Sequence, residues 1–401
     1  MLLPLSGIKV LDLTHALAGP YASMILGDFG AEVVKVEASP KGDLLRGWGI
    51  KLGESSTYSM SANRNKKGIL LNYRAPGALE LLKELAIGSD VILENFRPGV
   101  MNDLGLSYET LKKLNPRLIY GKISGYGESG PKSNEPGFDI VAQACSGLMS
   151  INGSEESGPL RVGVPIGDLG AGMWLAMGVF AALRQRDMTG EGQKVETSLL
   201  STLINMLGDH SQTWLSKGRV SGLTGNTHPA MSPYGAYRAR DATMIIAPGS
   251  QSLWLAFCDV IGLHFQANDN DFSTPQARTQ NSAQLKLLIE ERLASDTAVN
   301  WTRKLVKAGV PAGPIYDVSQ ALEDEQVHSW GLVESLDHPE LGLWKVTANP
   351  VRLSANGNAL ATRLIPPRPG EHTVQCLSDY GLSREKIQQL LSAGVIVQAS
   401  S

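Results

Sequence analysis

The 401-residue chain has few cysteines, no block of basic residues and no long apolar run. Cys145, Cys258 and Cys376 lie far apart and form no CxxC pair, which is typical of small core residues in a reducing compartment. A net charge of −3 without a basic block argues against nucleic acid as a partner. Because no run of 18 apolar residues and no basic, hydrophobic leader is present, we expect no membrane span and a cytoplasmic protein.

The phosphate-binding fingerprint GxGxxG is also missing from the turn at residues 14–20, although the chain contains 43 glycines. Residues 8–13 and 32–37 read as buried strands, and residues 21–29 between them read as a helix. Strand, helix and strand make a βαβ unit, so the chain begins like a nucleotide-binding α/β protein. The missing fingerprint argues against a dinucleotide dehydrogenase.

Further predicted strands, at 69–72, 89–94 and 117–123, each end in a polar or glycine-rich turn. The carboxyl ends of parallel strands meet at one edge of a sheet, where α/β proteins bind ligands. We therefore expect His15 to contact a phosphorylated or thioester ligand there. Phe96 is suited to stack on an adenine, and Arg97 to meet phosphate. In the alternative interpretation these are ordinary turn residues satisfied by their own neighbours.

A long polar loop, residues 38–68, carries several cations. Most of them are expected to be solvated side chains. The segment Asn63-Arg64-Asn65-Lys66-Lys67-Gly68 is denser and leads directly into a predicted strand. Cations at this place can hold a nucleotide phosphate through charge-assisted hydrogen bonds.

One carboxylate, Asp168, stands within the apolar and glycine-rich segment 161–172. Four glycines in this segment offer positive φ angles and close approach, and Pro165 fixes a turn, so we predict a tight loop before a helix over 173–183. An acid buried among such neighbours has raised reactivity unless it is paired. The alternative is that Asp168 only caps the helix.

The remaining pattern indicates two domains, which is the usual organisation at this length. A long helix is expected over 199–216, and the turn-rich residues 218–235 mark a boundary. Beyond it the chain reads as a hairpin, three helices, short strands and a last helix, at residues 237–247, 253–261, 283–294, 296–308, 330–365 and 383–391. We predict a large domain from residues 1–220 and 326–401, and a small domain from 221–325.

Taken together, several segments resemble the class III CoA-transferases of the formyl-CoA:oxalate and carnitine type. The resemblance covers nearly the whole chain and depends on the order and spacing of its motifs. They are residues 7–37 (GIKVLDLTHALAGPYAS to AEVVKVE), Asn95-Phe96-Arg97-Pro98-Gly99, Ser124-Gly125-Tyr126-Gly127, Val164–Asp168 and Thr189-Gly190-Glu191-Gly192-Gln193.

This resemblance implies an α/β fold: a Rossmann-like large domain built from both chain ends, a smaller α+β domain, and an interlocked homodimer. It implies CoA and acyl-CoA as substrates, with no metal. Asp168 matches the family's catalytic aspartate, which attacks an acyl-CoA thioester to give a mixed anhydride and then an aspartyl-CoA thioester. A carboxylate is a competent nucleophile for such covalent steps, and glycine N–H groups nearby can stabilise the oxyanion.

The resemblance also implies a set of CoA-binding positions along the sheet edge. They are His15, Ala16, Leu17, Ala18, Arg46, Leu71, Asn72, Arg74, Asn95, Phe96, Arg97, Phe138 and Asp139. Ala38 and Asp103 stand where some members have arginine, and the glycine run of the formyl-CoA enzymes is replaced by Ala247-Pro248-Gly249-Ser250. Arg46 or Arg97 can supply the missing charge.

Three functions therefore stay open. The first is transfer of CoA between carboxylic acids, with small dicarboxylates such as succinate or oxalate as candidate acceptors. The second is racemisation of 2-methylacyl-CoA, which needs a Gly-His-Asp triplet where this chain has Gly137-Phe138-Asp139. Phenylalanine cannot move a proton, which disfavours this function. The third is a non-catalytic CoA-binding protein.

Overall fold

The computed structural model describes residues 2–265, 267, 269–355 and 360–399. Contacts within the chain divide it into two compact units. The first consists of Met1–Leu148, Arg161–Arg219 and Gln326–Ser401, and the second of Met149–Leu160 and Val220–Glu325. The division of the protein into a large and a small domain stays a prediction.

The first unit is built on a seven-stranded sheet with the order β10-β7-β6-β1-β2-β5-β16. Its strands are β1 (Lys9–Asp12), β2 (Glu32–Ala38), β5 (Lys66–Leu71), β6 (Val91–Glu94), β7 (Ile119–Ser124), β10 (Lys194–Ser198) and β16 (Ile396–Val397). All pairings are parallel except that of β16 with β5. The strand order reverses beside β1, which is the place where such sheets bind ligands. The predicted mixed α/β fold is confirmed.

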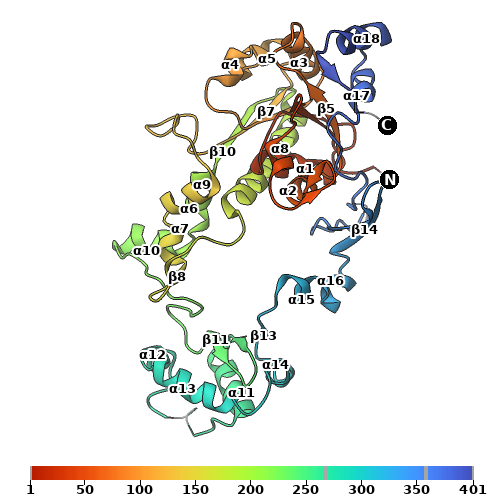
Figure 1. Ribbon diagram of the computed structural model, residues 1–401. Coiled ribbons are helices and arrows are strands. Elements are labelled where there is room, and N and C mark those ends of the chain that lie inside the picture. Colours follow the sequence, from red (N-terminus) through yellow and green to blue (C-terminus); the bar gives the residue numbers. More distant parts are fainter. Residues whose placement is uncertain (1, 266, 268, 356–359, 400–401) are drawn as a thin grey trace. The chain divides into compact units, whose positions relative to one another are not determined.

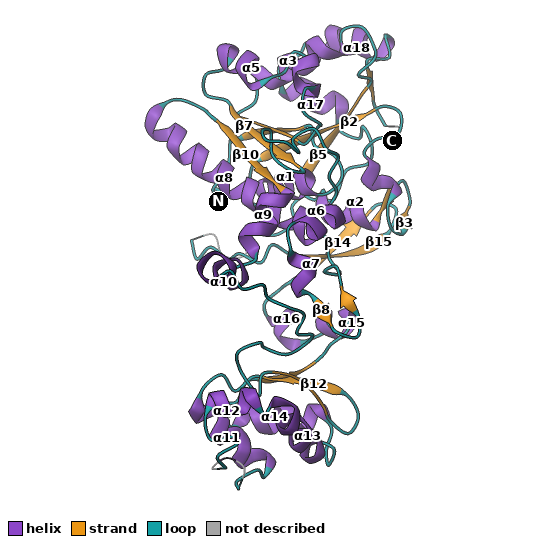
Figure 2. Ribbon diagram, turned by 90° about the vertical axis from the view of Figure 1, so that its left-hand side faces the viewer, coloured by secondary structure: helices purple, strands orange, loops and turns teal. Residues whose placement is uncertain are grey.

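Helices cover both faces of this sheet (Figures 1 and 2). One core cluster joins the sheet to α3 (Ala78–Ile87), α5 (Tyr108–Leu114), α17 (Thr373–Asp379) and α18 (Arg384–Ser392). The other joins it to α1 (Ala18–Asp28), α8 (Ile166–Thr189) and α9 (Leu199–Met206). Strands buried on both faces explain why their sequences are apolar runs rather than alternating patterns.

Helix α8 is long and apolar enough to cross a membrane by length and composition, with a mean hydropathy of 1.5 and 50% of that window buried. Core helices have the same character, and α8 packs in the core cluster with α1. The expectation that no segment spans a membrane stays a prediction.

Shorter elements complete the first unit around the sheet. They are η1 (Leu44–Gly47), β3 (Lys51–Leu52), β4 (Ser55–Ser56), α2 (Thr57–Ala62), α4 (Val100–Asp103), α6 (Asp139–Cys145), α10 (Asp209–Lys217), β14 (Val333–His338) and β15 (Gly342–Thr347). The prediction of one helix over 199–216 was wrong. Gly208 has a φ of +56°, which interrupts the helical path between α9 and α10.

The second unit holds a three-stranded antiparallel sheet, β11 (Gly235–Arg238), β12 (Thr243–Ile246) and β13 (Ala312–Pro314). Among the described residues, the helices that accompany it are α11 (Gln251–Ile261), α12 (Pro275–Gln280), α13 (Ser282–Leu293) and α14 (Ala298–Lys307). Several short elements lie near the places where the chain passes from one unit to the other. They are α7 (Leu148–Ile151), β8 (Gly153–Ser154), β9 (Gly158–Pro159), α15 (Val318–Leu322) and α16 (Glu325–Ser329).

The three cysteines are free thiols, but they do not share one environment. Cys258 and Cys376 are buried core residues, as predicted. Cys145 is exposed, so its assignment to the core was wrong. It is the last residue of α6, whose buried residues are Asp139, Ala142 and Gln143.

Candidate active site

A cavity of about 410 Å³ opens at the carboxyl edge of the sheet in the first unit. The loops after β1, β6 and β7 line it together with the first turn of α8. The predicted site residues that it brings together are His15, Ala16, Leu17, Ala18, Asn95, Phe96, Arg97, Phe138 and Asp168. The strand ends therefore meet on one edge, as the turn pattern predicts.

The loop between β1 and α1 is clamped to the loop after β6 through Asn95. The Asn95 side-chain oxygen accepts a hydrogen bond from the backbone N–H of His15 at 2.9 Å, and its amide donates to the carbonyl of His15 at 2.7 Å. The rings of His15 and Phe96 lie 5.3 Å apart at an interplanar angle of 39°. Burial lowers the pKa of His15 despite the negative charge of Asp43, so its imidazole is neutral near pH 7.

Asp168 lies in the first turn of α8, because the helix begins at Ile166, seven residues earlier than predicted. Gly163, Gly167, Gly170 and Gly172 all have negative φ angles, so the positive φ angles that glycine offers are not used in this segment. Three of these glycines serve close packing instead. A Cβ at Gly172 would lie 2.6 Å from the Ala18 carbonyl oxygen, which brings α8 against the start of α1.

The carboxylate of Asp168 is half-buried and has no hydrogen-bond or ion-pair partner among the described residues. Burial raises its pKa to about 7, with a further contribution from the negative charge of Asp139. An unpaired acid of this kind facing a cavity is typical of a reactive group rather than a structural one.

Asp139 is the acid that holds the start of α8. Its carboxylate accepts a hydrogen bond from the backbone N–H of Gly167 at 2.7 Å and another from the Gln143 amide at 2.7 Å. Gln143 in turn accepts from the N–H of Val162 at 2.8 Å. Since Asp168 makes no cap hydrogen bond, the interpretation of Asp168 as a simple helix cap was wrong.

Five predicted CoA-binding residues do not line this cavity: Asp139, which holds the start of α8, and Arg46, Leu71, Asn72 and Arg74. Arg46 forms a buried ion pair with Glu37 at 2.6 Å and donates to the carbonyl of Pro367. Leu71 is buried in β5, and Asn72 and Arg74 lie in the turn after it. A second hollow of about 300 Å³ extends toward that strand edge and shares His15, Leu44 and Phe96 with the first.

The cations of residues 63–68 are not free to hold phosphate. Arg64 pairs with Asp28 at 2.6 Å, Lys66 with Asp12 at 3.1 Å, and Lys67 with Asp379 at 2.8 Å. The first two pairs are buried, where an unpaired charge would be costly. The acids lie in other elements, so the segment alone could not reveal these pairs.

Several cavity residues were not predicted, among them Trp48, Ser133 and Glu135. They come from irregular segments, where the sequence has no periodicity that places a side chain. Two buried charged residues, Asp12 and Lys35, were also missed, although the sequence around them indicates that they are buried. Each is the one charged residue within an apolar stretch of its strand, and the two are direct register partners in β1 and β2.

Residues 5–373 match the family described as CoA-transferase family III. The chain belongs to CoA-transferase family III. It is 37% identical over 397 residues to the succinyl-CoA:glutarate CoA-transferase of Mus musculus, covering 98% of this chain and 91% of that protein. It is 39% identical over 319 residues to the acetyl-CoA:oxalate CoA-transferase of Acetobacter aceti, covering 79% and 82%.

A solved structure of a CAIB/BAIF family protein from Brucella suis has the same fold. It is 32% identical, with a TM-score of 0.85 over 95% of this chain and 100% of that one. Membership of CoA-transferase family III makes this chain an enzyme of the CoA-transferase class rather than a non-catalytic binding protein. The cavity at the sheet edge is the candidate place for its chemistry.

Proposed function

We propose that this family III enzyme moves CoA from an acyl-CoA donor to a carboxylic acid, with Asp168 as the nucleophile. One observation carries the proposal: Asp168 is an unpaired, half-buried carboxylate at the cavity, and its pKa is raised to about 7. A carboxylate with a raised pKa is a stronger nucleophile once ionised, and near neutral pH a large fraction is ionised.

The proposed exchange conserves charge at every step. The Asp168 carboxylate attacks the thioester carbonyl, forming a mixed anhydride and releasing CoA thiolate. The thiolate attacks the aspartyl carbonyl, which gives an aspartyl-CoA thioester and frees the donor acid. The acceptor carboxylate attacks that thioester, and the released thiolate then takes the new acyl group. Asp168 is regenerated without a net proton change.

Backbone N–H groups at the start of α1 support this chemistry. Ala18 begins α1 and lines the cavity, and the first N–H groups of a helix have no partner within the helix. They suit a developing oxyanion. The glycines beside Asp168 supply less than predicted, because the N–H of Gly167 already donates to Asp139.

Small dicarboxylates are the proposed acceptors. The relatives in mouse and Acetobacter aceti are named for glutarate and oxalate. Arg97 is the one Lys or Arg among the lining residues that the structure describes, and it makes no ion pair there. It can hold either a CoA phosphate or a second carboxylate, so the acceptor and CoA-binding roles need separate measurement.

A matrix of acyl-CoA donors and carboxylate acceptors tests this function. Labelled acid should appear as its CoA ester only when both substrates are present, with dicarboxylates ahead of monocarboxylates of similar length. Asp168→Ala should abolish exchange in every combination. Hydrolysis of acyl-CoA without transfer, or transfer that survives in Asp168→Ala, would contradict the proposal.

Racemisation is the second candidate, because His15 also lies in the cavity as a neutral imidazole. Phe138 occupies the position of the required base and is 60% exposed there. The α-proton of a 2-methylacyl-CoA should therefore not exchange with deuterated water. Rapid deuterium uptake without an acceptor acid would favour racemisation, and His15→Ala would then be the variant that removes it.

We further propose that the enzyme acts as a homodimer. Several large apolar side chains are exposed on the first unit, on α8, α9 and α10. They are Met173, Trp174, Met177, Ile204, Trp214 and Leu215. Apolar surface of this kind is typical of subunit interfaces. Light scattering coupled to size exclusion should give the mass of two chains, and a monomer at assay concentration would contradict it.

A further inference from the structure

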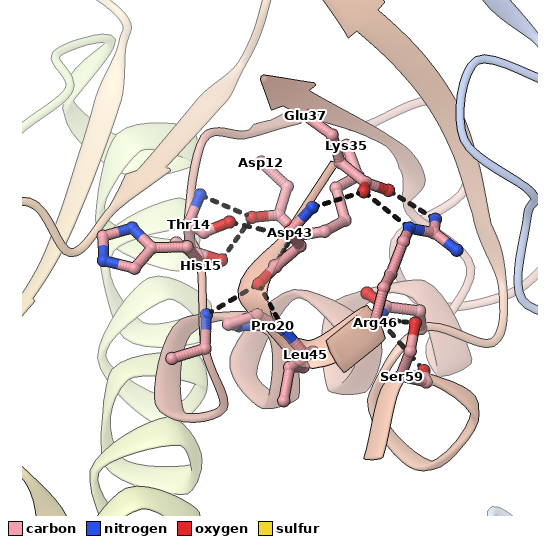
Figure 3. A network of polar contacts seen from close by, with 12 residues as sticks. Asp12, Thr14, His15, Pro20, Lys35, Glu37, Asp43, Leu45, Arg46 and Ser59 are labelled. Carbon is pink, nitrogen blue, oxygen red and sulfur yellow. Dashed lines mark hydrogen bonds and ion pairs between the residues drawn. The ribbon is translucent and has the colours of Figure 1, made fainter. Parts of the chain in front are cut away.

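The loop that lines the cavity together with Asp168 rests on a layer of buried charges (Figure 3). Asp12, at the end of β1, accepts hydrogen bonds from the backbone N–H and the hydroxyl of Thr14 at 2.9 and 2.5 Å. It also accepts from the Ser23 hydroxyl at 2.5 Å and pairs with Lys66 at 3.1 Å. These contacts fix Thr14, the second residue after β1.

A second pair, Lys35 with Asp43, holds the loop at Thr14 and at Ala16, two residues further along. The Lys35 ammonium donates to the carbonyl of Thr14 at 2.8 Å and forms an ion pair with Asp43 at 2.8 Å. The other oxygen of Asp43 accepts from the backbone N–H groups of Ala16 at 3.1 Å and Leu45 at 3.0 Å. Figure 3 shows the imidazole of His15 turned away from these carboxylates.

The residue that Asp43 holds has an unusual backbone conformation. Ala16 has a φ of +59°, and in the described part of the chain only Asn65 shares this feature among non-glycine residues. The left-handed region is sterically unfavourable for an alanine, so surrounding contacts must impose it. The Asp43 carboxylate supplies such a contact to Ala16, and Asn95 clamps the preceding residue.

This turn determines where the start of α1 points. Leu17 and Ala18 follow it directly and line the cavity that Asp168 lines. Gly19 packs closely on Thr14, since a Cβ there would lie 2.3 Å from the Thr14 Cβ. Contacts with the buried charges and with Gly19 therefore hold Thr14 in place. The backbone conformation of Ala16 then determines the direction in which Leu17 and Ala18 continue.

We propose that Lys35 and Asp43 act as a positioning pair, which holds Ala16 left-handed and thereby aligns the start of α1 with Asp168 for acyl transfer. This role rests on the proposed function of Asp168. Neither side chain touches the reacting atoms, so both are positioning residues. A buried ion pair by itself adds little net stability, so stability alone does not explain the presence of these two buried charges.

Two double variants separate the hydrogen bond to Ala16 from the loss of charge. Lys35→Met with Asp43→Asn removes both charges but keeps an oxygen that can accept from Ala16. Lys35→Met with Asp43→Ala removes both charges and the acceptor. We expect kcat about tenfold lower in the second than in the first, with the Kd for CoA nearly equal. Equal kcat values would overturn the proposal.

Adding Ala16→Gly to the second variant gives a rescue test. Glycine adopts positive φ without the steric cost of a Cβ, so it no longer needs the Asp43 contact. We expect most of the lost kcat to return. A merely structural role of Asp43 would not be repaired by a change at Ala16, and absence of rescue would contradict the positioning role.

A control and a milder variant keep the test informative. Asp28→Asn disturbs a comparably buried ion pair, with Arg64 at the other end of α1, and should lower the melting temperature while kcat stays unchanged. If the alanine variant does not fold, Asp43→Glu retains the charge but displaces the carboxylate. Its kcat should fall and be restored by Ala16→Gly, and an unaltered kcat would overturn the proposal.

Failure of the proposed function would look different. If Asp168 is not the nucleophile, Asp168→Ala retains turnover in the same assay, whatever the Asp43 variants do. If only the positioning role is wrong, Asp168→Ala is inactive while the two double variants have the same kcat.

Discussion

Asp12 and Asp43, beneath the start of α1, are each held by several donors, whereas Asp168, at the start of α8, has none among the residues that the structure describes. Burial alone would raise the pKa of Asp12, but Lys66 and Lys35 hold it below its usual range. Asp168 has no such cation, and burial raises its pKa to about 7. Aspartate side chains at one edge of the sheet thus hold the backbone in place at Asp12 and Asp43 and provide a candidate nucleophile at Asp168.

Removal of the unpaired acid should have the largest effect on activity. Asp168→Ala is expected to lower kcat for exchange by on the order of 10³-fold or more, because no other route to a covalent intermediate exists in the proposal. Titration should show CoA affinity close to that of the wild type. Near-normal turnover in this variant would remove Asp168 from the chemistry.

The two kinds of acid should respond oppositely in stability. Asp12→Ala leaves the buried ammonium of Lys66 without its ion-pair partner, so we expect a loss of about 3–5 kcal/mol in the free energy of unfolding. Asp168→Asn removes an acid whose ionisation is opposed by burial, so we expect a gain of roughly 1–3 kcal/mol at pH 8.

The direction in which stability changes with pH follows from the difference in the pKa of Asp168 between the folded and the unfolded chain. Its pKa is about 7 in the folded chain and 3.8 as an ordinary carboxyl. Between these values the folded state binds more protons, so the stability due to this group falls as pH rises through that window. Chemical unfolding at pH 5 and pH 8 should show a gain from Asp168→Asn that is larger at the higher pH. A stability loss at pH 8 would contradict this comparison.

A smaller effect is expected at the cation that faces the cavity. Arg97→Ala should weaken CoA binding by on the order of 1–3 kcal/mol if the guanidinium meets a phosphate through charge-assisted hydrogen bonds. Arg292→Ala, on the exposed side of α13, is the matched control. If CoA affinity is unchanged but the KM for the acceptor acid rises, Arg97 binds the acid instead.

The smallest expected effect is a shift of the pH profile on replacing Asp139, whose charge contributes to the raised pKa of Asp168. The rate constant kcat/KM should rise with pH through about 7 as Asp168 ionises in the free enzyme. Asp139→Asn removes a negative charge, which favours the ionised form and moves the midpoint to lower pH. The shift is expected to be within about one unit, since burial is the larger cause. A shift to higher pH would contradict the account.

The sequence best predicted those features that depend on residues close together in the chain. Apolar strands buried on both faces and glycine-rich turns predict the βαβ pattern and the edge at which the site lies. Asp168 stood out because it is the one acid in its segment. Long-range contacts could not be inferred in the same way: Gly167, Gly170 and Gly172 permit close helix packing rather than positive φ.

The same limit explains the misassigned cations. Arg46 and Arg64 looked free because their partners, Glu37 and Asp28, belong to other elements. A charged residue within an apolar strand, as at Asp12 or Lys35, is a better signal than a dense cationic loop. Such a charge must find a partner when the strand is buried, and here the partners support the loop beside the candidate site.

The proposed exchange requires a covalent intermediate at one residue, Asp168. The enzyme would be incubated with an acyl-CoA donor without acceptor, treated with hydroxylamine, digested and mapped by mass spectrometry. We predict a hydroxamate on Asp168, absent without donor and absent in Asp168→Ala. A hydroxamate at another acid such as Asp139 or Glu135, or none while label still passes between acids, would contradict the central claim.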